Sequence, residues 1–309
     1  MPMLSRIAES LFWIGRYVER ADGTARIVDA LRLQLLEDPT ADESASAATV
    51  LGVIMGMPVS GPTGVADVGA RLVFDRSATS SITGALHAAR ENARRARETL
   101  STELWESINT TWHRWNGLGR HSVTERHLSW VRERASLIAG IADSTMSHDD
   151  AWQFLVLGRS LERADMTARL VATGGLSTGG PPWSAVLSSC GAQQAFMRSH
   201  RGMLTDERAA AFLALDRQFP RSVLFALTEA EQRLRSLSPE VERLGVSDEA
   251  RRRLGSIRTA LEYGITSDVV AGLPVQMKAV QTAVTAASAS IAERYFQSGP
   301  LPTWTEELI

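Results

Sequence analysis

Apolar residues recur every three or four positions along most of this chain, which is the period of an α-helix. The longest such stretch covers residues 5–36. It contains no proline, and Pro39 follows its end, where a proline cannot continue a helix. No segment shows the alternation of apolar and polar residues that indicates a β-strand. The pattern predicts an all-α protein, with further helices at 48–57, 65–74, 81–100, 101–115, 123–144, 151–173, 183–199, 205–215, from Pro220 onward, 248–263 and 271–296.

One stretch of the chain occurs twice. Residues 15–26 and 158–169 are identical at nine of twelve positions. A second pair of similar segments, around Asp75 and around Asp216, is separated by nearly the same length of chain as the first pair. Two anchors with nearly equal spacing predict a pseudo-duplicated helical bundle, in which two fused copies pack as one compact unit about a pseudo-two-fold axis. The expected copies are residues 1–146 and 147–309, with 298–309 as an irregular tail.

The repeated stretch carries a charged stripe that we expect to be buried. At about 100° per residue, Leu11 and Val18 lie on an apolar face, while Phe12 and Ile27 fall among the charged residues of the opposite side. A helix that is apolar nearly all round is usually buried, and buried charges are costly unless they are paired. We therefore expect ion pairs Arg16–Glu19, Asp22–Arg26 and Asp165–Arg169, with Glu19-Arg20 close to Glu162-Arg163 at the centre of the fold.

Two interpretations of the stripe stay open. The charges form either a closed network that fixes how the halves dock, or a cleft whose spare guanidinium groups bind a carboxylate or phosphate. Arginines outnumber acids in the first copy, and Gly23 leaves space that its counterpart Met166 fills, so the copies need not be equivalent. The candidates are Glu19 and Glu162 as catalytic groups, Arg16, Arg20, Arg26, Arg159, Arg163, Arg169, Arg221 and Ser222 as substrate- or anion-binding groups, and Asp22 and Asp165 as structural ion-pair partners.

Other polar residues are further candidates for a pocket. Arg221 and Ser222 fall in the first turn of a helix, where free N–H groups favour anions, with ordinary capping as the alternative. A polar and aromatic cluster at 103–109 either caps a helix and packs in the core or lines a pocket. The full set is Tyr17, Thr24, Thr167, Asp75, Ser81, Asp216, Glu103, Trp105, Glu106 and Asn109.

Composition narrows the function classes. The 309 residues carry a net charge of −2, so we expect neither a nucleic-acid surface nor a polybasic membrane anchor. Cys190 is the single cysteine, which excludes an internal disulfide and fits the cytoplasm. The histidines lack metal-ligand spacing, and no Gly-rich phosphate loop occurs, so we expect this chain to bind neither a metal nor ATP. The long uncharged runs are broken by Gly, Pro and Ser, so no membrane span is expected.

Four segments in order resemble the alpha-E family, which comprises bacterial all-helical proteins named for an embedded Glu-Arg motif. They are residues 4–21, 101–109, 157–169 and 219–223. The chain departs from the family at Ser160, where an aromatic residue is usual, and over residues 42–65. The resemblance implies a circularly permuted ATP-grasp ligase as partner, with ATP and Mg on that partner and often a transglutaminase-like protease nearby. Such ligases activate a carboxylate as an acyl phosphate and join it to an amine, so the resemblance implies a role in peptide or amide synthesis.

Three functions follow as hypotheses. The favoured one is an accessory or co-catalytic subunit of an ATP-grasp ligase, which binds the enzyme and holds an acidic substrate with the motif arginines. The second is an independent enzyme of peptide modification with Glu19 or Glu162 as general base and the arginines around an anionic intermediate. The third is a structural scaffold whose stripe is a closed ion-pair core.

Overall fold

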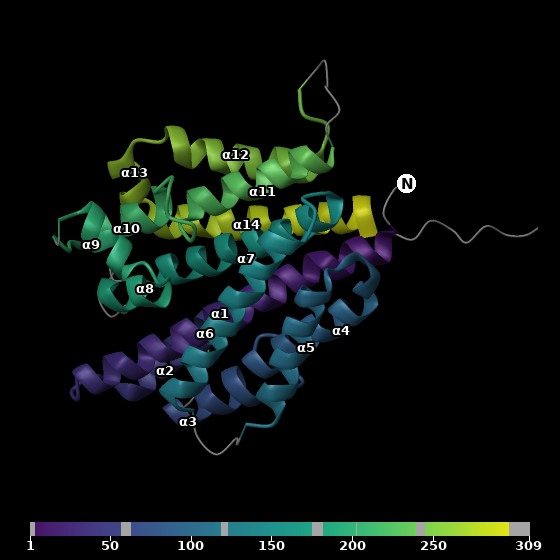
Figure 1. Cartoon of the computed structure of the whole chain (residues 1–309). Helices are drawn as coiled ribbons and strands as arrows, with labels where there is room; N and C mark the ends of the chain where they lie inside the picture. Colours follow the sequence, from purple (N-terminus) through teal and green to yellow (C-terminus); the bar gives the residue numbers. More distant parts are fainter. Residues whose placement is uncertain are drawn as a thin grey trace, which may run out of the picture.

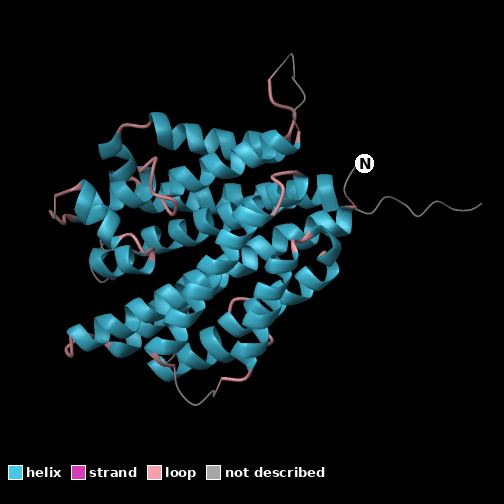
Figure 2. Ribbon diagram, viewed as in Figure 1, coloured by secondary structure: helices cyan, strands magenta, loops and turns pink. Residues whose placement is uncertain are grey.

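The computed structural model describes residues 4–56, 63–118, 123–174, 182–201, 203–238 and 245–296. The regular structure of these residues is entirely helical, without a β-strand (Figure 2). The all-α prediction is therefore confirmed. The tail expected at 298–309 lies outside the described residues.

Two long helices, α1 (Ser5–Glu37) and α7 (Asp150–Thr173), pack against each other in the middle of the molecule (Figure 1). A group of three helices joins each of them. The first and third helices of each group pack against the central helix, and the second helix packs against the first and the third. Each group thus forms a four-helix bundle with its central helix. The groups are α4 (Ile82–Arg95), α5 (Thr102–Asn116) and α6 (Glu125–Thr145) with α1, and α11 (Val223–Leu237), α12 (Glu249–Tyr263) and α14 (Leu273–Ile291) with α7.

Shorter helices connect these groups. The helix α8 (Trp183–Ser189) packs on α1, and α2 (Glu43–Met55) packs on α7, so each half of the chain covers part of the other half's central helix. The shorter elements are α2 (Glu43–Met55), α3 (Val65–Val68), a π-helical segment at Gly69–Phe74, a 3-10 turn at Arg97–Thr99, α8 (Trp183–Ser189), α9 (Gln193–Ser199), α10 (Asp206–Leu215), α13 (Thr266–Ala271) and a second π-helical segment at Ala292–Phe296.

Some element boundaries differ from the sequence prediction for local reasons. The helix expected over 183–199 is two helices, because Gly191 between them has a left-handed backbone with φ of 63°. The helix expected to open at Pro220 begins at Val223, because Ser222 caps it and accepts a hydrogen bond from the backbone nitrogen of Phe225 at 3.1 Å. Both differences follow from backbone signals that apolar spacing does not contain.

The central helices approach each other closely at Gly15 and Gly158, which the repeat places in equivalent positions. A side chain on Gly15 would lie 2.9 Å from the backbone nitrogen of Arg159 and would collide with the carbonyl oxygen of Leu155. A side chain on Gly158 would collide with the carbonyl oxygen of Phe12, which is the counterpart of Leu155 in the first copy. Glycine allows this approach because it has no Cβ. Reciprocal contacts are what a duplicated unit would produce, and the division at 146/147 stays a prediction.

Candidate functional site

Glu162 on α7 is the first centre of the charged stripe. Its carboxylate accepts hydrogen bonds from Nε of Arg16 at 2.7 Å and from Nε and Nη2 of Arg20 at 2.5 and 2.9 Å. Arg16 also donates to Oγ of Ser288 at 3.0 Å. Glu162 is only 3% exposed, which confirms the predicted burial. The expected pair between Arg16 and Glu19 is wrong, because Arg16 reaches across to α7 instead.

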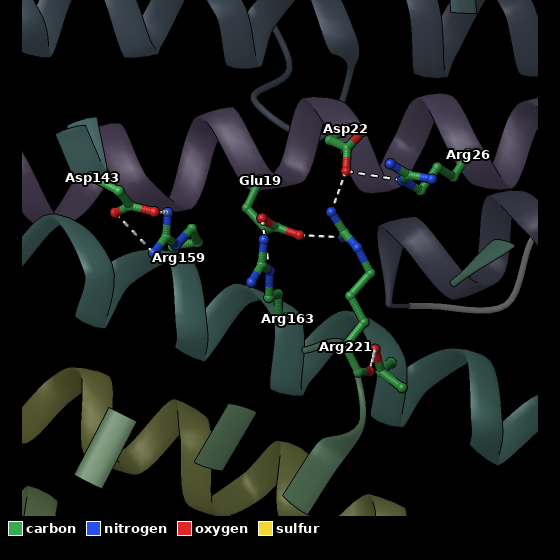
Figure 3. Close-up of polar contacts among 8 residues, drawn as sticks. Glu19, Asp22, Arg26, Asp143, Arg159, Arg163 and Arg221 are labelled. Atoms are coloured by element: carbon green, nitrogen blue, oxygen red, sulfur yellow. Dashed lines mark hydrogen bonds and ion pairs between the residues drawn. The ribbon is translucent and has the colours of Figure 1, made fainter. Parts of the chain in front are cut away.

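Glu19 on α1 is the second centre (Figure 3). Its Oε2 lies 3.0 Å from Nε of Arg163, and its Oε1 accepts a hydrogen bond from Arg221, whose other terminal nitrogen donates to Asp22. Arg221 lies just before α11, so a third part of the chain enters the network. Glu19 is 6% exposed and Asp22 is 2% exposed. The predicted meeting of the two Glu-Arg pairs is confirmed, because each glutamate contacts the arginine of the other copy.

Both glutamates are held as carboxylates. Burial alone would raise the pKa of Glu19, but the charges of Arg163 and Arg221 outweigh burial and lower the pKa to about 2. Burial of Glu162 is likewise outweighed by its two guanidinium partners on α1, which lower its pKa to about 2. A carboxylate that is so weakly basic, and whose oxygens already accept hydrogen bonds, is a poor general base near neutral pH.

Each copy of the motif also holds an outer ion pair within its own helix. Nε of Arg26 lies 2.9 Å from Oδ2 of Asp22, and Nε of Arg169 lies 2.9 Å from Oδ2 of Asp165, as predicted. Burial raises the pKa of Asp165, and the charge of Arg169 offsets this only in part. The two guanidinium groups lie against glycines with left-handed backbones, Gly191 beside Arg26 and Gly56 beside Arg169.

A narrow cleft of about 50 Å³ reaches the Glu19 side of the network. Since one water needs about 10–15 Å³, the cleft has room for a few waters or one carboxylate group. Arg159 at this cleft is held less closely than the other arginines, because its contacts with Asp143 are 3.3 and 3.4 Å long and Asp143 is itself 44% exposed. The charged lining residues are Glu19, Asp22, Arg159, Arg163 and Arg221.

Guanidinium groups outnumber carboxylates on both sides of the network. Burial lowers the pKa of Arg163, and although Glu19 raises it, the charge of Arg221 lowers it again, so the net direction is downward. The excess of positive charge around Glu19 therefore rests on the count of its charged groups, three arginines against two carboxylates. The groups on the two sides are Arg26, Arg163 and Arg221 with Glu19 and Asp22, and Arg16, Arg20 and Arg169 with Glu162 and Asp165.

Three further candidates lie on the central helices beside the network. Tyr17 stacks on Trp13 with ring centroids 5.2 Å apart, and the guanidinium group of Arg20 lies 5.5 Å from the Tyr17 ring. Thr167 donates a hydrogen bond to the carbonyl oxygen of Arg221 at 2.9 Å, which helps to place that residue. Thr24 is fully buried. Tyr17 and Thr167 thus support the network, whereas the hydroxyl group of Thr24 has no hydrogen-bond partner among the described residues.

Ser81 and Ser222 are capping residues. Their hydroxyl oxygens accept hydrogen bonds from the first turns of α4 and α11, respectively, and donate to the carbonyl oxygens of Asp75 and Asp216. Ser222 is fully buried. The capping alternative therefore describes Ser222, and its hydroxyl group is not available to an anion.

The candidates at 103–109 lie on α5, and the structure does not bring them to the central network. Glu103 and Glu106 are exposed, while Trp105 and Asn109 are half-buried. The guanidinium group of Arg97 lies 5.3 Å from the Trp105 ring, and Asn109 accepts a hydrogen bond from Arg90 at 3.1 Å. These contacts place the cluster on the outside of the first helical group.

The sequence prediction missed two polar partners, Asp143 on α6 and Ser288 on α14. They contact Arg159 and Arg16, respectively, from helices that are distant in sequence. No spacing rule within the repeated stretch points to them, because their positions depend on how α6 and α14 lie beside the central helices.

Within the described ranges, no group of three or more His, Cys, Asp or Glu side chains is arranged to hold a metal ion. Among the helices that the structure describes, none combines the length and apolar character that crossing a membrane requires. Cys190 is buried, and burial raises the pKa of its thiol to about 12, so the thiolate is disfavoured.

The fold and the paired Glu-Arg motifs define an all-helical class of protein. Residues 3–296 match the profile of the Alpha-E family, described as a predicted alpha-helical domain with a conserved ER motif, and the chain belongs to this family. It is 25% identical over 266 residues to the uncharacterized proteins Rv2567 of Mycobacterium tuberculosis (strain ATCC 25618 / H37Rv) and Mb2597 of Mycobacterium bovis. The match covers 75% of this chain but 30% of those proteins. No solved structure matches the chain.

Proposed function

We propose that this chain is an accessory or co-catalytic subunit of an ATP-grasp peptide- or amide-ligase system in the cytoplasm. The partner ligase carries ATP and Mg, and a transglutaminase-like protease belongs to the same system. The observation that carries the proposal is the cleft beside Glu19, where buried guanidinium groups outnumber carboxylates. A carboxylate substrate or an acyl phosphate would supply the missing negative charge.

Arg159 is the group best suited to receive this anion. Its present partner, Asp143, is 44% exposed and lies 3.3 Å away. An incoming carboxylate can replace Asp143 without leaving a buried charge unpaired, because Asp143 then returns to water. The other arginines at the cleft would lose a buried partner in such an exchange.

Two observations support an accessory role over an independent enzyme. Glu19 and Glu162 have pKa values of about 2 and accept hydrogen bonds from arginines, which disfavours a role as general base. In the mycobacterial relatives, the matching region is 30% of a longer chain, so there the helical unit is joined to other segments. A unit that is joined to other segments is suited to work beside a partner.

The test begins with co-purification of this chain from native cells and identification of an ATP-grasp protein among its partners. ATP consumption by that ligase is then measured with candidate amino acids, with and without the chain. Arg159→Met should leave ligase binding intact and reduce turnover roughly tenfold or more, because one charge-assisted contact is lost. Arg198→Met on α9, at an exposed arginine outside the cleft, is the matched control and should change neither.

A purely structural scaffold is the second candidate. It is favoured by the seven candidate arginines, each of which contacts a carboxylate within the chain. A scaffold predicts that Arg159→Met leaves ligase turnover unchanged. Turnover of an ATP-independent substrate by the purified chain alone would contradict both candidates. It would instead favour the hypothesis of an independent enzyme.

A further inference from the structure

A larger cavity lies between α1, α2, α7 and α8. Its volume is about 370 Å³, which falls in the range of about 300–1,000 Å³ that is typical of small-molecule sites. Its walls are mainly apolar, with a few hydroxyl and amide groups, as in such sites. The apolar lining includes Ile27, Leu31, Val50, Val53, Leu170 and Val186.

This cavity borders the charged network. A small cavity of about 10 Å³ is lined by Glu19, Arg163 and Arg221, and it shares Ile27 and Leu170 with the large one. The cleft beside Arg159 shares the same three charged residues on its other side. The three cavities therefore form a row from an apolar chamber to the guanidinium groups.

Met166 narrows this row between the chamber and the arginines. It lines the small cavity, and its Cε would lie 3.3 Å from a side chain placed on Gly23. Methionine has an unbranched and flexible side chain that adapts to gaps. Because Gly23 has no side chain, Met166 packs directly over α1 at this point, and a change of its rotamer would open the row without displacing the backbone.

We propose that the large cavity binds the apolar part of a small carboxylic acid, whose carboxylate reaches past Met166 to Arg163 and Arg221 and lies beside Glu19 without displacing it. The proposal rests on the proposed function in one respect, because it gives the substrate class of the anion that the guanidinium groups around Glu19 would bind. Glu19 and Ile27 are eight residues apart on one helix, or about 12 Å along its axis. A medium-chain acid has the length to join the two places.

The charges of the lining decide between an acid and an amine. One guanidinium group in excess on the Glu19 side attracts a carboxylate. Asp42 is the one charged residue among the described lining of the large cavity and would attract an amine instead. However, it is exposed, and its Oδ1 accepts the capping hydrogen bond from the backbone nitrogen of Ala45 at 3.0 Å. The buried arginines therefore exert the stronger attraction.

The experiment is calorimetric titration of the full chain with octanoate and with octylammonium, without any ligase present. Octanoate should bind at one site per chain, and octylammonium at least about tenfold more weakly, a difference of about 1.4 kcal/mol. Met166→Ala should tighten octanoate binding, because it removes the narrowing. Absence of octanoate binding, or equal binding of the two probes, would overturn the proposal.

Thr49→Trp fills the cavity and should reduce octanoate affinity at least about tenfold. Its control is Thr282→Trp, at an exposed helical threonine that donates to the carbonyl oxygen four residues earlier, as Thr49 does. An equal loss of octanoate affinity in both variants would contradict binding in the large cavity. If Thr49→Trp does not fold, the comparison of the two probes on the unmodified chain decides. Octanoate binding without any effect of the chain on a ligase would instead contradict the proposed function alone.

Discussion

Glu19 and Glu162 occupy equivalent positions in the two copies of the motif, but different parts of the chain hold them. Glu162 takes both of its partners, Arg16 and Arg20, from α1. Glu19 takes one partner from α7 and recruits Arg221 from the segment before α11. The two central helices thus supply both arginines that bind Glu162, whereas Glu19 takes an arginine from a third part of the chain.

The difference follows from one position in the second anchor. When Asp75 is aligned with Asp216, the counterpart of Arg221 is Ser80, which has no charge to offer. Asp165 therefore keeps a single arginine, and burial raises its pKa. Arg159 is the counterpart of Arg16, which binds the glutamate of the other copy. Because Arg221 binds Glu19 instead, Arg159 contacts Asp143 at the cleft. A cleft reaches the Glu19 side of the duplicated stretch, and there Arg159 contacts a carboxylate that is 44% exposed.

The largest expected effect is the loss of stability at low pH, which both buried glutamates should produce. Each glutamate has a folded pKa of about 2 against an ordinary value of 4.5. The stability from each is fully present above about pH 4.5 and is lost as pH falls toward 2, roughly 3 kcal/mol per glutamate. Asp165 acts in the opposite sense, because its raised pKa favours the folded state on protonation. Urea unfolding from pH 7 to pH 2 measures the slope, and Glu19→Gln and Glu162→Gln should each flatten it. An unchanged slope in either variant would show that the sides are not alike.

Arg221→Met should separate the two sides. It leaves Glu19 and Asp22 buried with one partner fewer and should lower the free energy of unfolding by about 3–5 kcal/mol. The control is Arg217→Met, whose arginine is 66% exposed and 3.3 Å from Glu262, with an expected loss below about 1 kcal/mol. Denaturant unfolding at neutral pH measures both. A loss for Arg221→Met as small as that of the control would mean that the third element is dispensable.

Gly15→Ala and Gly158→Ala test whether the crossing is symmetric. Either new side chain would collide with a carbonyl oxygen of the opposite helix, so we expect each to cost about 1–3 kcal/mol. Gly140→Ala on α6 is the control, because nothing lies within 4 Å of its added Cβ and alanine favours a helix by up to about 1 kcal/mol. Thermal unfolding measures the loss of stability in each variant. Unequal losses for Gly15→Ala and Gly158→Ala would show that the crossing is not symmetric.

The smallest effect concerns Gly23. An alanine there would lie 3.3 Å from Cε of Met166, a flexible group that can shift. The gain in helix propensity should nearly cancel the cost of the contact, so the free energy of unfolding should change by less than about 1 kcal/mol. Denaturant unfolding measures this change. A large loss would show that Met166 is held rigidly, which would weaken its role as a movable side chain.

Much of this fold was readable from the order of residues. The period of apolar positions predicted the helices, and Phe12 and Ile27 among the charges predicted that the stripe is buried. The spacing of four residues predicted the pairs Asp22–Arg26 and Asp165–Arg169. These features are local, since they depend on one helix and on whether its surroundings are apolar.

Tertiary structure decided which charges meet. Periodicity made Glu19 a neighbour of Arg16 on one helix, but the close approach at Gly15 and Gly158 directs Arg16 across to Glu162. The network is completed by Arg221, which lies beyond the motif in sequence. The sequence alone thus determined that buried arginines and carboxylates need partners, because an isolated buried charge is costly. The choice of partners and the space left beside them were decided by how the helices cross, because that geometry depends on contacts between residues far apart in the chain.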